Sequence, residues 1–394
     1  MSATVGIPDR TTRALPWWVA ASVVLVALNL RPSVVGVGPL LAQIRADEAL
    51  TATAAGVLTA LPVLCFGLLA PVAPRLARRI GIERALLTAL GVLILGCVVR
   101  ALPGAAALFG GTVLIGAAIA TGNVLMPALV KRDFAHRTGA MTAAYSAAIS
   151  VGGALGAAVT APVADGLGLG WRAALAAWAL WAVAAALCWL PQLRRVARPA
   201  ATAAPVAALR RSTIAWQVTA FMGLQSLGFY ATTSWLPEVF TDRGYPPATA
   251  GVLVATMSLT GIAGGMAAPV LAARARRQRG LAVAITATTA LGLAGVLLLP
   301  GWELAACIVL GIGQGAALGL ALTLMTVRAS DSAHAAQLSG MAQCLGYLLA
   351  ATGPFAVGLL HDLTAGWTVP LVTLLLLLVP QAVLGALAGR DKLV

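Results

Sequence analysis

TATAAGVLTALPVLCFGLLAPVAPRLARR, residues 51–79, is an apolar run that ends in a cluster of arginines. About 20 consecutive apolar residues are enough for one α-helix to cross the hydrocarbon core of a bilayer. The pattern returns at residues 247–277 as PATAGVLVATMSLTGIAGGMAAPVLAARARR, again with arginines at its end. Each segment therefore predicts a membrane-spanning helix followed by a basic loop.

The composition of the whole chain also indicates a membrane protein. Of its 394 residues, 60% are hydrophobic and 10% are charged, whereas soluble domains carry about 25% charged residues. The formal net charge is +14, which on a soluble face is typical of nucleic-acid binding. Here the basic residues lie between apolar runs, as in the cytoplasmic loops of membrane proteins, so we expect no nucleic-acid partner.

Twelve apolar runs of spanning length predict an all-α polytopic membrane protein. They lie near residues 16–43, 51–72, 84–103, 105–130, 138–163, 171–190, 213–240, 247–273, 280–300, 303–327, 336–361 and 367–388. The loops on one side hold 21 of the 26 basic residues, and the other five are Arg31, Arg45, Arg100, Arg172 and Arg243. Because Lys and Arg collect in cytoplasmic loops, we expect both termini to be cytoplasmic, in a multi-pass protein of the cytoplasmic (inner) membrane.

The two halves of the sequence repeat each other's landmarks about 195–200 residues apart. The matches are Ala55-Gly56-Val57-Leu58 with Ala250-Gly251-Val252-Leu253, Ala70-Pro71-Val72 with Ala268-Pro269-Val270, Pro103-Gly104 with Pro300-Gly301, and Ile115-Gly116 with Ile312-Gly313. Several matches in order at nearly one offset indicate a duplicated six-helix unit. We predict an N-terminal six-helix bundle over residues 1–190, a cytoplasmic linker over 191–211 and a C-terminal six-helix bundle over 212–394. Two such halves are typical of transporters that bind substrate between them near the bilayer midplane.

This layout resembles the major facilitator superfamily, and three motifs resemble its cyanate/2-nitroimidazole transporter family. The motifs are Asn29-Leu30-Arg31-Pro32, Gly122-Asn123-Val124-Leu125-Met126-Pro127 running into Val130-Lys131-Arg132-Asp133-Phe134, and Ser234-Trp235-Leu236-Pro237-Glu238. The resemblance covers nearly the whole sequence. It implies two pseudo-symmetric six-helix bundles in the major facilitator fold and transport of a small solute.

The sequence departs from one superfamily pattern in the loop between the second and third predicted spans. The superfamily sequence Gly-x-x-x-Asp-Arg-x-Gly-Arg-Arg corresponds here to Pro74, Arg78, Arg79, Gly81, Ile82 and Glu83. The acidic residue that braces the cytoplasmic gate in the superfamily is therefore replaced by Arg78.

Arg31 is the strongest candidate for a substrate-binding residue. It lies near the middle of the first predicted span, where an arginine costs roughly 2.5–3.5 kcal/mol even on the gentlest insertion scale. It must therefore face the protein interior and find electron-rich partners, either an anionic substrate or the carbonyls of neighbouring helices. All twelve Asp and Glu residues fall in loops or near span ends, and Glu238 is the deepest of them. The missing counter-charge is then the substrate itself.

Other polar residues lie deep in predicted spans. In the superfamily's arrangement, spans one, four, seven and ten line the central cavity and spans two, five, eight and eleven flank it. Asn29 shares the cavity with Arg31 only if Pro32 distorts the first span, because two residues correspond to about 200° around an ideal helix. Each deep polar residue has an alternative role, which is to form a hydrogen bond between helices. Together with Arg31 and Asn29, the predicted substrate-binding set contains Asn123, Tyr145, Gln225, Tyr230, Gln314, Gln343 and Tyr347.

Two Gly-x-x-x-Gly pairs predict close helix packing. They are Gly152 with Gly156 in span five, and Gly261 with Gly265 in span eight, and such spacing lets helix backbones approach closely. Because spans five and eight meet across the halves in the superfamily, we expect these pairs to form a sliding interface between the halves.

We predict a secondary transporter that moves a small anionic or polar solute, such as a cyanate-like anion, a carboxylate or a nitroheterocycle, by alternating access. The alternative is a multidrug-type exporter of small hydrophobic compounds, which Arg31 disfavours. We expect no enzymatic activity, because His136, His334 and His361 are far apart and no acidic cluster accompanies them. We expect no cofactor, no metal, a monomer in the lipid bilayer, and a proton or an exchanged anion as coupling partner.

Overall fold

The computed structural model describes residues 17–393, except 135–136, 167, 169, 195–208, 210, 276 and 331. The predicted linker 191–211 lies mostly outside the described residues. The basic residues Arg10, Arg13 and Arg276 and the histidine His136 lie outside them too.

The first half of the protein folds into helices that correspond to the first six predicted spans. The first span is interrupted, the second is followed by a short basic helix, and the sixth is divided in two. The elements are α1 (Trp17–Leu28), α2 (Pro32–Val35), the 3₁₀ helix η1 (Gly38–Leu40), α3 (Leu41–Asp47), α4 (Ala52–Leu69), α5 (Val72–Ile80), α6 (Ile82–Arg100), α7 (Ala105–Asp133), α8 (Thr138–Gly166), α9 (Gly170–Ala176), α10 (Trp178–Trp189) and the 3₁₀ helix η3 (Leu190–Arg194).

The second half folds into one long helix for each predicted span. These are α11 (Thr213–Asp242), α12 (Pro247–Arg274), α13 (Arg279–Leu298), α14 (Glu303–Val327), α15 (Ser332–Thr364) and α16 (Thr368–Ala388). The start of α11 shows a local capping signal. The Ser212 hydroxyl accepts from the Ala215 amide at the start of α11, which satisfies one of the free N–H groups of a helix N-terminus.

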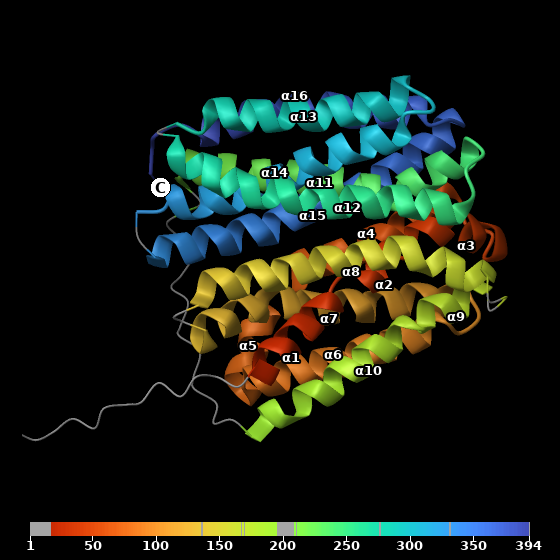
Figure 1. Cartoon of the computed structure of the whole chain (residues 1–394), viewed down its shortest axis with the longest axis horizontal. Helices are drawn as coiled ribbons and strands as arrows, with labels where there is room; N and C mark the ends of the chain where they lie inside the picture. The colour runs from red at the N-terminus through yellow and green to blue at the C-terminus, as the bar shows by residue number, and fades with distance from the viewer. Residues whose placement is uncertain are drawn as a thin grey trace, which may run out of the picture.

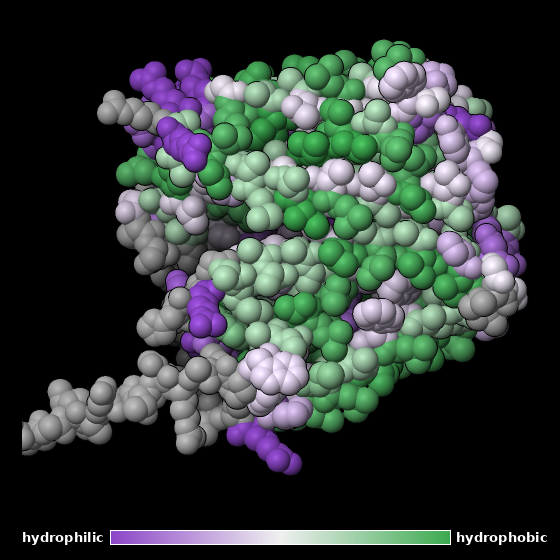
Figure 2. Space-filling view, in the orientation of Figure 1, coloured by the Kyte–Doolittle hydropathy of each residue, from purple (hydrophilic) through white to green (hydrophobic). Residues whose placement is uncertain are grey.

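The twelve predicted spans are confirmed to within a few residues. Among the described residues, eleven helical segments are long and apolar enough to cross a membrane. Helix α11 is the twelfth long helix and is less apolar because it contains Gln217, Gln225 and Glu238. Figure 2 shows an apolar band over the middle of the visible face, with hydrophilic residues gathered at its two ends. Lipid is the solvent that such a surface requires.

The two halves lie side by side with their helices roughly parallel to one axis (Figure 1). The most extensive contacts between them are made by two helix pairs, α4 with α15 and α8 with α12. One end of the molecule carries α5, the C-terminal ends of α12 and α14, and the C-terminus of the protein (Figure 1). We call it the basic end, because Arg78, Arg79, Arg274 and Arg328 lie there. The opposite end carries α3 and α9.

The two Gly-x-x-x-Gly pairs pack within the halves, so the prediction that they form the interface between the halves is wrong. A Cβ atom at Gly152 would lie 2.2 Å from the Leu28 carbonyl oxygen of the first span. In the other half, a Cβ atom at Gly261 would lie 3.3 Å from the Gly311 oxygen of α14. Other glycines make the close contacts across the halves, and Gly251 is the tightest: its Cβ would lie 2.1 Å from the Ala157 oxygen of α8.

Candidate functional site

The first span is broken at the position that exposes Arg31. Proline has no backbone N–H and disfavours the helical conformation of the residue before it. Helix α1 accordingly ends at Leu28, α2 begins at Pro32, and Arg31 between them has φ −129°. The backbone N–H of Asn29 donates to the backbone oxygen of Val26 at 3.0 Å, which forms a tighter turn than that of an α-helix. Pro32 therefore interrupts the first span and leaves Arg31 outside regular helix.

A cavity of about 910 Å³ lies between the two halves. Its walls are formed by the interrupted first span, α7 and α8 from one half, and by α11, α12, α14 and α15 from the other. The lining continues toward the basic end, as far as Thr142 on α8, Val270 on α12 and Thr326 on α14. Figure 2 shows a recess between the halves toward this end.

Arg31 lines this cavity and lies over aromatic rings of the other half. Its guanidinium carbon lies 4.9 Å from the centre of the Phe229 ring and 5.4 Å from that of Tyr230. Cations at such distances are attracted by the ring face. Within the described part of the protein, the Arg31 guanidinium has no ion pair and no hydrogen bond, so the cation–π contacts are the partners that the protein itself supplies to it.

The two rings belong to a larger aromatic cluster. Tyr230 packs on Phe66 with ring centres 6.2 Å apart and on Tyr347 at 6.4 Å, and Phe66 and Tyr347 lie 5.7 Å apart. Phe66 comes from α4 of the first half, so the cluster joins the halves beside Arg31. Phe66 and Phe229 are absent from the predicted set, because an aromatic residue in an apolar span gives no signal that separates a cavity wall from a lipid-facing surface.

Eight of the nine predicted site residues line the cavity. Besides Arg31, they are Asn123, Tyr145, Gln225, Tyr230, Gln314, Gln343 and Tyr347. The glutamine side chains are held by hydrogen bonds to hydroxyl groups, within one helix for Gln225 and Gln343 and between α14 and α11 for Gln314. Gln225 donates to the Ser226 hydroxyl at 2.6 Å, Gln314 to the Thr232 hydroxyl at 3.0 Å, and Gln343 to the Ser339 hydroxyl at 2.9 Å.

Asn29 is the exception and does not line the cavity. Its side-chain amide donates to the Leu25 oxygen at 2.8 Å and to the Trp181 oxygen of α10 at 3.3 Å. The break at Pro32 turns Arg31 toward the cavity but leaves Asn29 in the last turn before the break. In the structure, Asn29 thus takes the interhelical role that was its alternative.

Polar contacts join the halves at the end opposite the basic end, which we call the closed end. Arg45 forms an ion pair with Glu238, and the Glu238 side chain is only 5% exposed. Asp362 accepts hydrogen bonds from the Ala52 amide at 2.9 Å and from the Thr53 amide at 2.6 Å, at the N-terminus of α4. The cavity is therefore lined toward one end of the molecule and sealed by cross-half contacts at the other.

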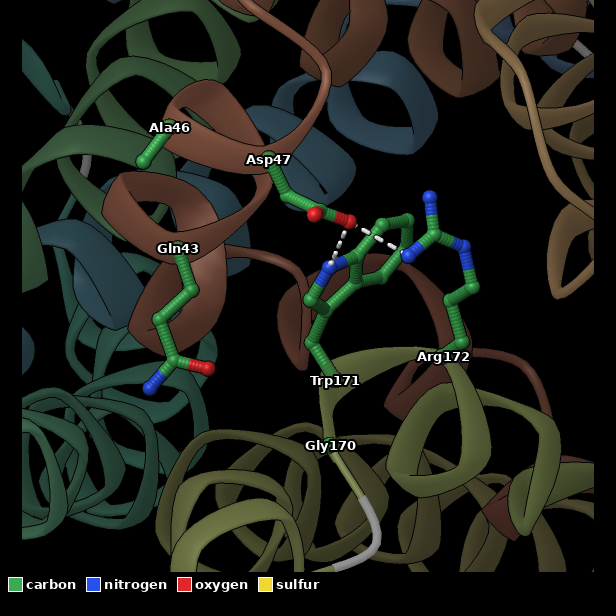
Figure 3. A pocket seen from close by; sticks show the side chains of 6 residues that line it. All are labelled: Gln43, Ala46, Asp47, Gly170, Trp171 and Arg172. Atoms are coloured by element: carbon green, nitrogen blue, oxygen red, sulfur yellow. Dashed lines mark hydrogen bonds and ion pairs between the residues drawn. The ribbon is translucent and has the colours of Figure 1, made fainter.

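A separate shallow depression lies at the closed end of the first half, between α3 and α9 (Figure 3). Asp47 accepts from the Trp171 indole at 3.0 Å and pairs with Arg172, which also pairs with Glu48. The Arg172 guanidinium lies 4.2 Å from the centre of the Trp171 ring. Because these charges satisfy one another within one half, we interpret the depression as a clamp between α3 and α9.

Comparison with known proteins identifies the relatives of this protein. The uncharacterized transporter YycB of Bacillus subtilis (strain 168) is 41% identical over 383 residues, covering 95% of this chain and 94% of that protein. The 2-nitroimidazole transporter of Escherichia coli (strain K12) is 40% identical over 375 residues, covering 94% and 95%. The cyanate transport protein CynX of the same organism is 32% identical over 352 residues, covering 87% and 90%.

The fold is shared with solved transporters at low sequence identity. The structure of a bacterial homolog of the human lysosomal transporter Spinster, inward-facing and unoccupied, superposes with a TM-score of 0.76 at 14% identity, covering 96% of this chain and 98% of that one. The family model of the Major Facilitator Superfamily matches residues 18–354. These matches indicate a transporter and not an enzyme. With its twelve spans in two pseudo-symmetric bundles, the protein belongs to the Major Facilitator Superfamily.

Proposed function

We propose that this protein is a secondary transporter of a small anionic or polar solute, such as a cyanate-like anion, a carboxylate or a nitroheterocycle. The observation that carries the proposal is Arg31, a cation in a cavity between the halves with no anionic partner among the described residues. A guanidinium offers planar N–H donors that match carboxylate-like and nitro-like groups. The names of two relatives, a 2-nitroimidazole transporter and a cyanate transport protein, fit this class of solute.

Transport proceeds by alternating access in this proposal. The basic end faces the cytoplasm of a cell whose inner membrane holds the protein, because basic loops remain on that side. The structure then corresponds to the inward-facing state, with the cavity reached from the cytoplasm and the closed end facing outward. Rocking of the two halves against each other would open the closed end and present Arg31 to the other side.

The energetics limit how the transport of an anion can be driven. Moving one negative charge into a cell at −100 mV costs about 2.3 kcal/mol. The acidic residues that the structure describes lie in loops or toward helix ends, and none of them lies beside Arg31 to carry a proton. Export assisted by the potential, exchange of one anion for another, and passage of a substrate with its own proton each satisfy this limit.

The multidrug-exporter alternative predicts a different response to loss of the cation. Such an exporter accepts hydrophobic compounds, and an arginine at the centre of its cavity would cost desolvation energy without a partner. Replacement of Arg31 would then leave transport unchanged or improved. The anion-site proposal predicts loss of transport.

The test compares Arg31→Gln and Arg31→Lys with the parent protein in proteoliposomes and in ligand-dependent thermal-shift measurements against small anions, carboxylates and nitroheterocycles. Loss of a buried charged partner costs roughly 2–5 kcal/mol, so binding should weaken at least about 30-fold. Lys should rescue poorly, because it lacks the planar fork. Arg172→Gln is the matched control, since Arg172 is paired and far from the cavity. Transport by Arg31→Gln at the parent's rate would contradict the proposal.

A further inference from the structure

Gln314 leaves one atom of the cavity wall without a partner. The residue is 6% exposed, and its side-chain carbonyl oxygen Oε1 is buried without a hydrogen bond within the described structure. A buried acceptor left without a donor costs roughly 1–3 kcal/mol. Native proteins retain few such atoms, and each calls for a physical reason.

The hydroxyl of Thr232 fixes which end of the Gln314 amide is unpaired. The Thr232 Oγ1 lies 2.9 Å from the Gly228 oxygen and 3.0 Å from the Phe229 oxygen, so its single hydrogen is donated to the backbone of α11. Toward Gln314 the hydroxyl can therefore only accept. The Gln314 amide must present its NH₂ group to Thr232, at 3.0 Å, and its carbonyl oxygen is the orphan.

Gln314 lies on the face of α14 that lines the cavity. Gly311, Gln314, Gly315 and Leu318 line it together, and their spacing places them on one side of a helix. Thr232 is not among the lining residues, so the NH₂ end of the amide is turned to the helix behind the wall. The terminal torsion of a glutamine is broad, so the amide has the freedom to turn its oxygen toward a ligand in the cavity.

We propose that Gln314 is a specificity-determining residue that accepts a hydrogen bond from an N–H or O–H group of the substrate. This inference rests on the proposed function, and it narrows the substrate class. The solute carries an anionic or electron-rich group for Arg31 and, in addition, a hydrogen-bond donor for Gln314. Nitroheterocycles with a ring N–H and hydroxy acids meet both requirements, whereas a bare inorganic anion such as cyanate meets only the first.

The experiment is a ligand-by-variant cycle on the full-length protein, read by binding competition. The probes are 2-nitroimidazole and two methyl derivatives. The N-methyl derivative lacks the N–H donor. The 4-methyl derivative has the same size as the N-methyl derivative and keeps the donor. The parent protein should bind the two donor-bearing compounds roughly 5- to 150-fold more tightly than the N-methyl compound. In Gln314→Leu this ratio should fall to near one, because the apolar side chain leaves no acceptor unsatisfied.

Gln217→Leu is the matched control, because Gln217 also has a buried side-chain oxygen without a partner in the described structure but does not line the cavity, so the ratio should stay as in the parent. If Gln314→Leu does not fold, Gln314→Met, an unbranched side chain of similar length, gives the same reading. A parent protein that binds the three probes equally, or a Gln314 variant that keeps the parent's ratio, would overturn the role of Gln314 while Arg31-dependent binding persists. A parent protein that binds neither these probes nor small anions and carboxylates would overturn the proposed function and this inference with it.

Discussion

The ion pair between Arg45 and Glu238 should control how often the closed end opens. Arg45 follows the interrupted first span, Glu238 lies near the end of α11, and their side chains are 21% and 5% exposed. The pair joins the two halves, so it exists only while the closed end is closed. Removing one partner of a fully buried pair costs roughly 3–5 kcal/mol. Because Arg45 is partly exposed, we expect a smaller cost of about 1–3 kcal/mol for Glu238→Gln.

That loss falls on the closed state alone and therefore shifts the equilibrium toward the state that is open at this end. A shift of 1–3 kcal/mol corresponds to an increase of roughly 5- to 150-fold in the open population. Asp362 still holds the N-terminus of α4 through the amides of Ala52 and Thr53. The variant should therefore remain folded.

The assay measures the rate at which a membrane-impermeant thiol reagent labels a cysteine introduced at Thr233. The labelling of the parent protein, which reports its own cysteines, is subtracted as background. Thr233 is 3% exposed, and a Cβ atom at Gly38 of the other half would lie 2.8 Å from its carbonyl oxygen. Labelling from the closed end should accelerate in Glu238→Gln and return toward the parent's rate in the charge swap Arg45→Glu with Glu238→Arg.

Glu48→Gln provides the matched control for the closed-end experiment. Glu48 also pairs with an arginine at this end, but its partner Arg172 belongs to the same half. Its loss should leave the labelling rate unchanged. If Glu238→Gln labels Thr233→Cys at the parent's rate, or if Glu48→Gln accelerates labelling equally, the ion pair does not gate the closed end.

Three further predictions concern packing, topology and the broken span. Gly315→Ala should destabilise the protein by at least about 1–3 kcal/mol, seen as a lower melting temperature, because its Cβ would lie 1.9 Å from the Gly261 oxygen; Gly91→Ala, which meets nothing within 4 Å, should not. A cysteine at Thr241 should react with an impermeant reagent in intact cells while one at Arg390 should not, and the reverse pattern would overturn the orientation. Arg31→Gln should leave the melting temperature of the empty protein near the parent's, because the side chain loses only its cation–π contacts with Phe229 and Tyr230, and these offset no more than the cost of burying the charge; a fall of many degrees would show that Arg31 is a structural brace.

The sequence predicts the spans well because each needs only a long apolar run, which local composition reveals. The cavity set is largely predicted for a related reason, since polar residues in lipid-buried helices must turn inward. The partners of close contacts cannot be predicted from local sequence in this way. The spacing of Gly152 and Gly156 indicates that a helix can approach closely, but it does not say which helix does. Arg45 and Glu238 are 193 residues apart, and nothing local links them.

The duplication explains why the cation of one half lies on a ring of the other. The halves repeat at an offset of about 195–200 residues, and Phe229 lies within this range from Arg31. Residues near the axis that relates two repeats meet their own counterparts, and Arg31 and Phe229 are in contact. The first half has Pro32 and a broken helix at this level, whereas α11 runs unbroken from Thr213 to Asp242. An interruption in one repeat is enough to bring a charge to the axis, and the intact repeat can then keep an apolar ring against it. The two halves thus share an architecture and have diverged in chemistry at the level where Arg31 and Phe229 meet.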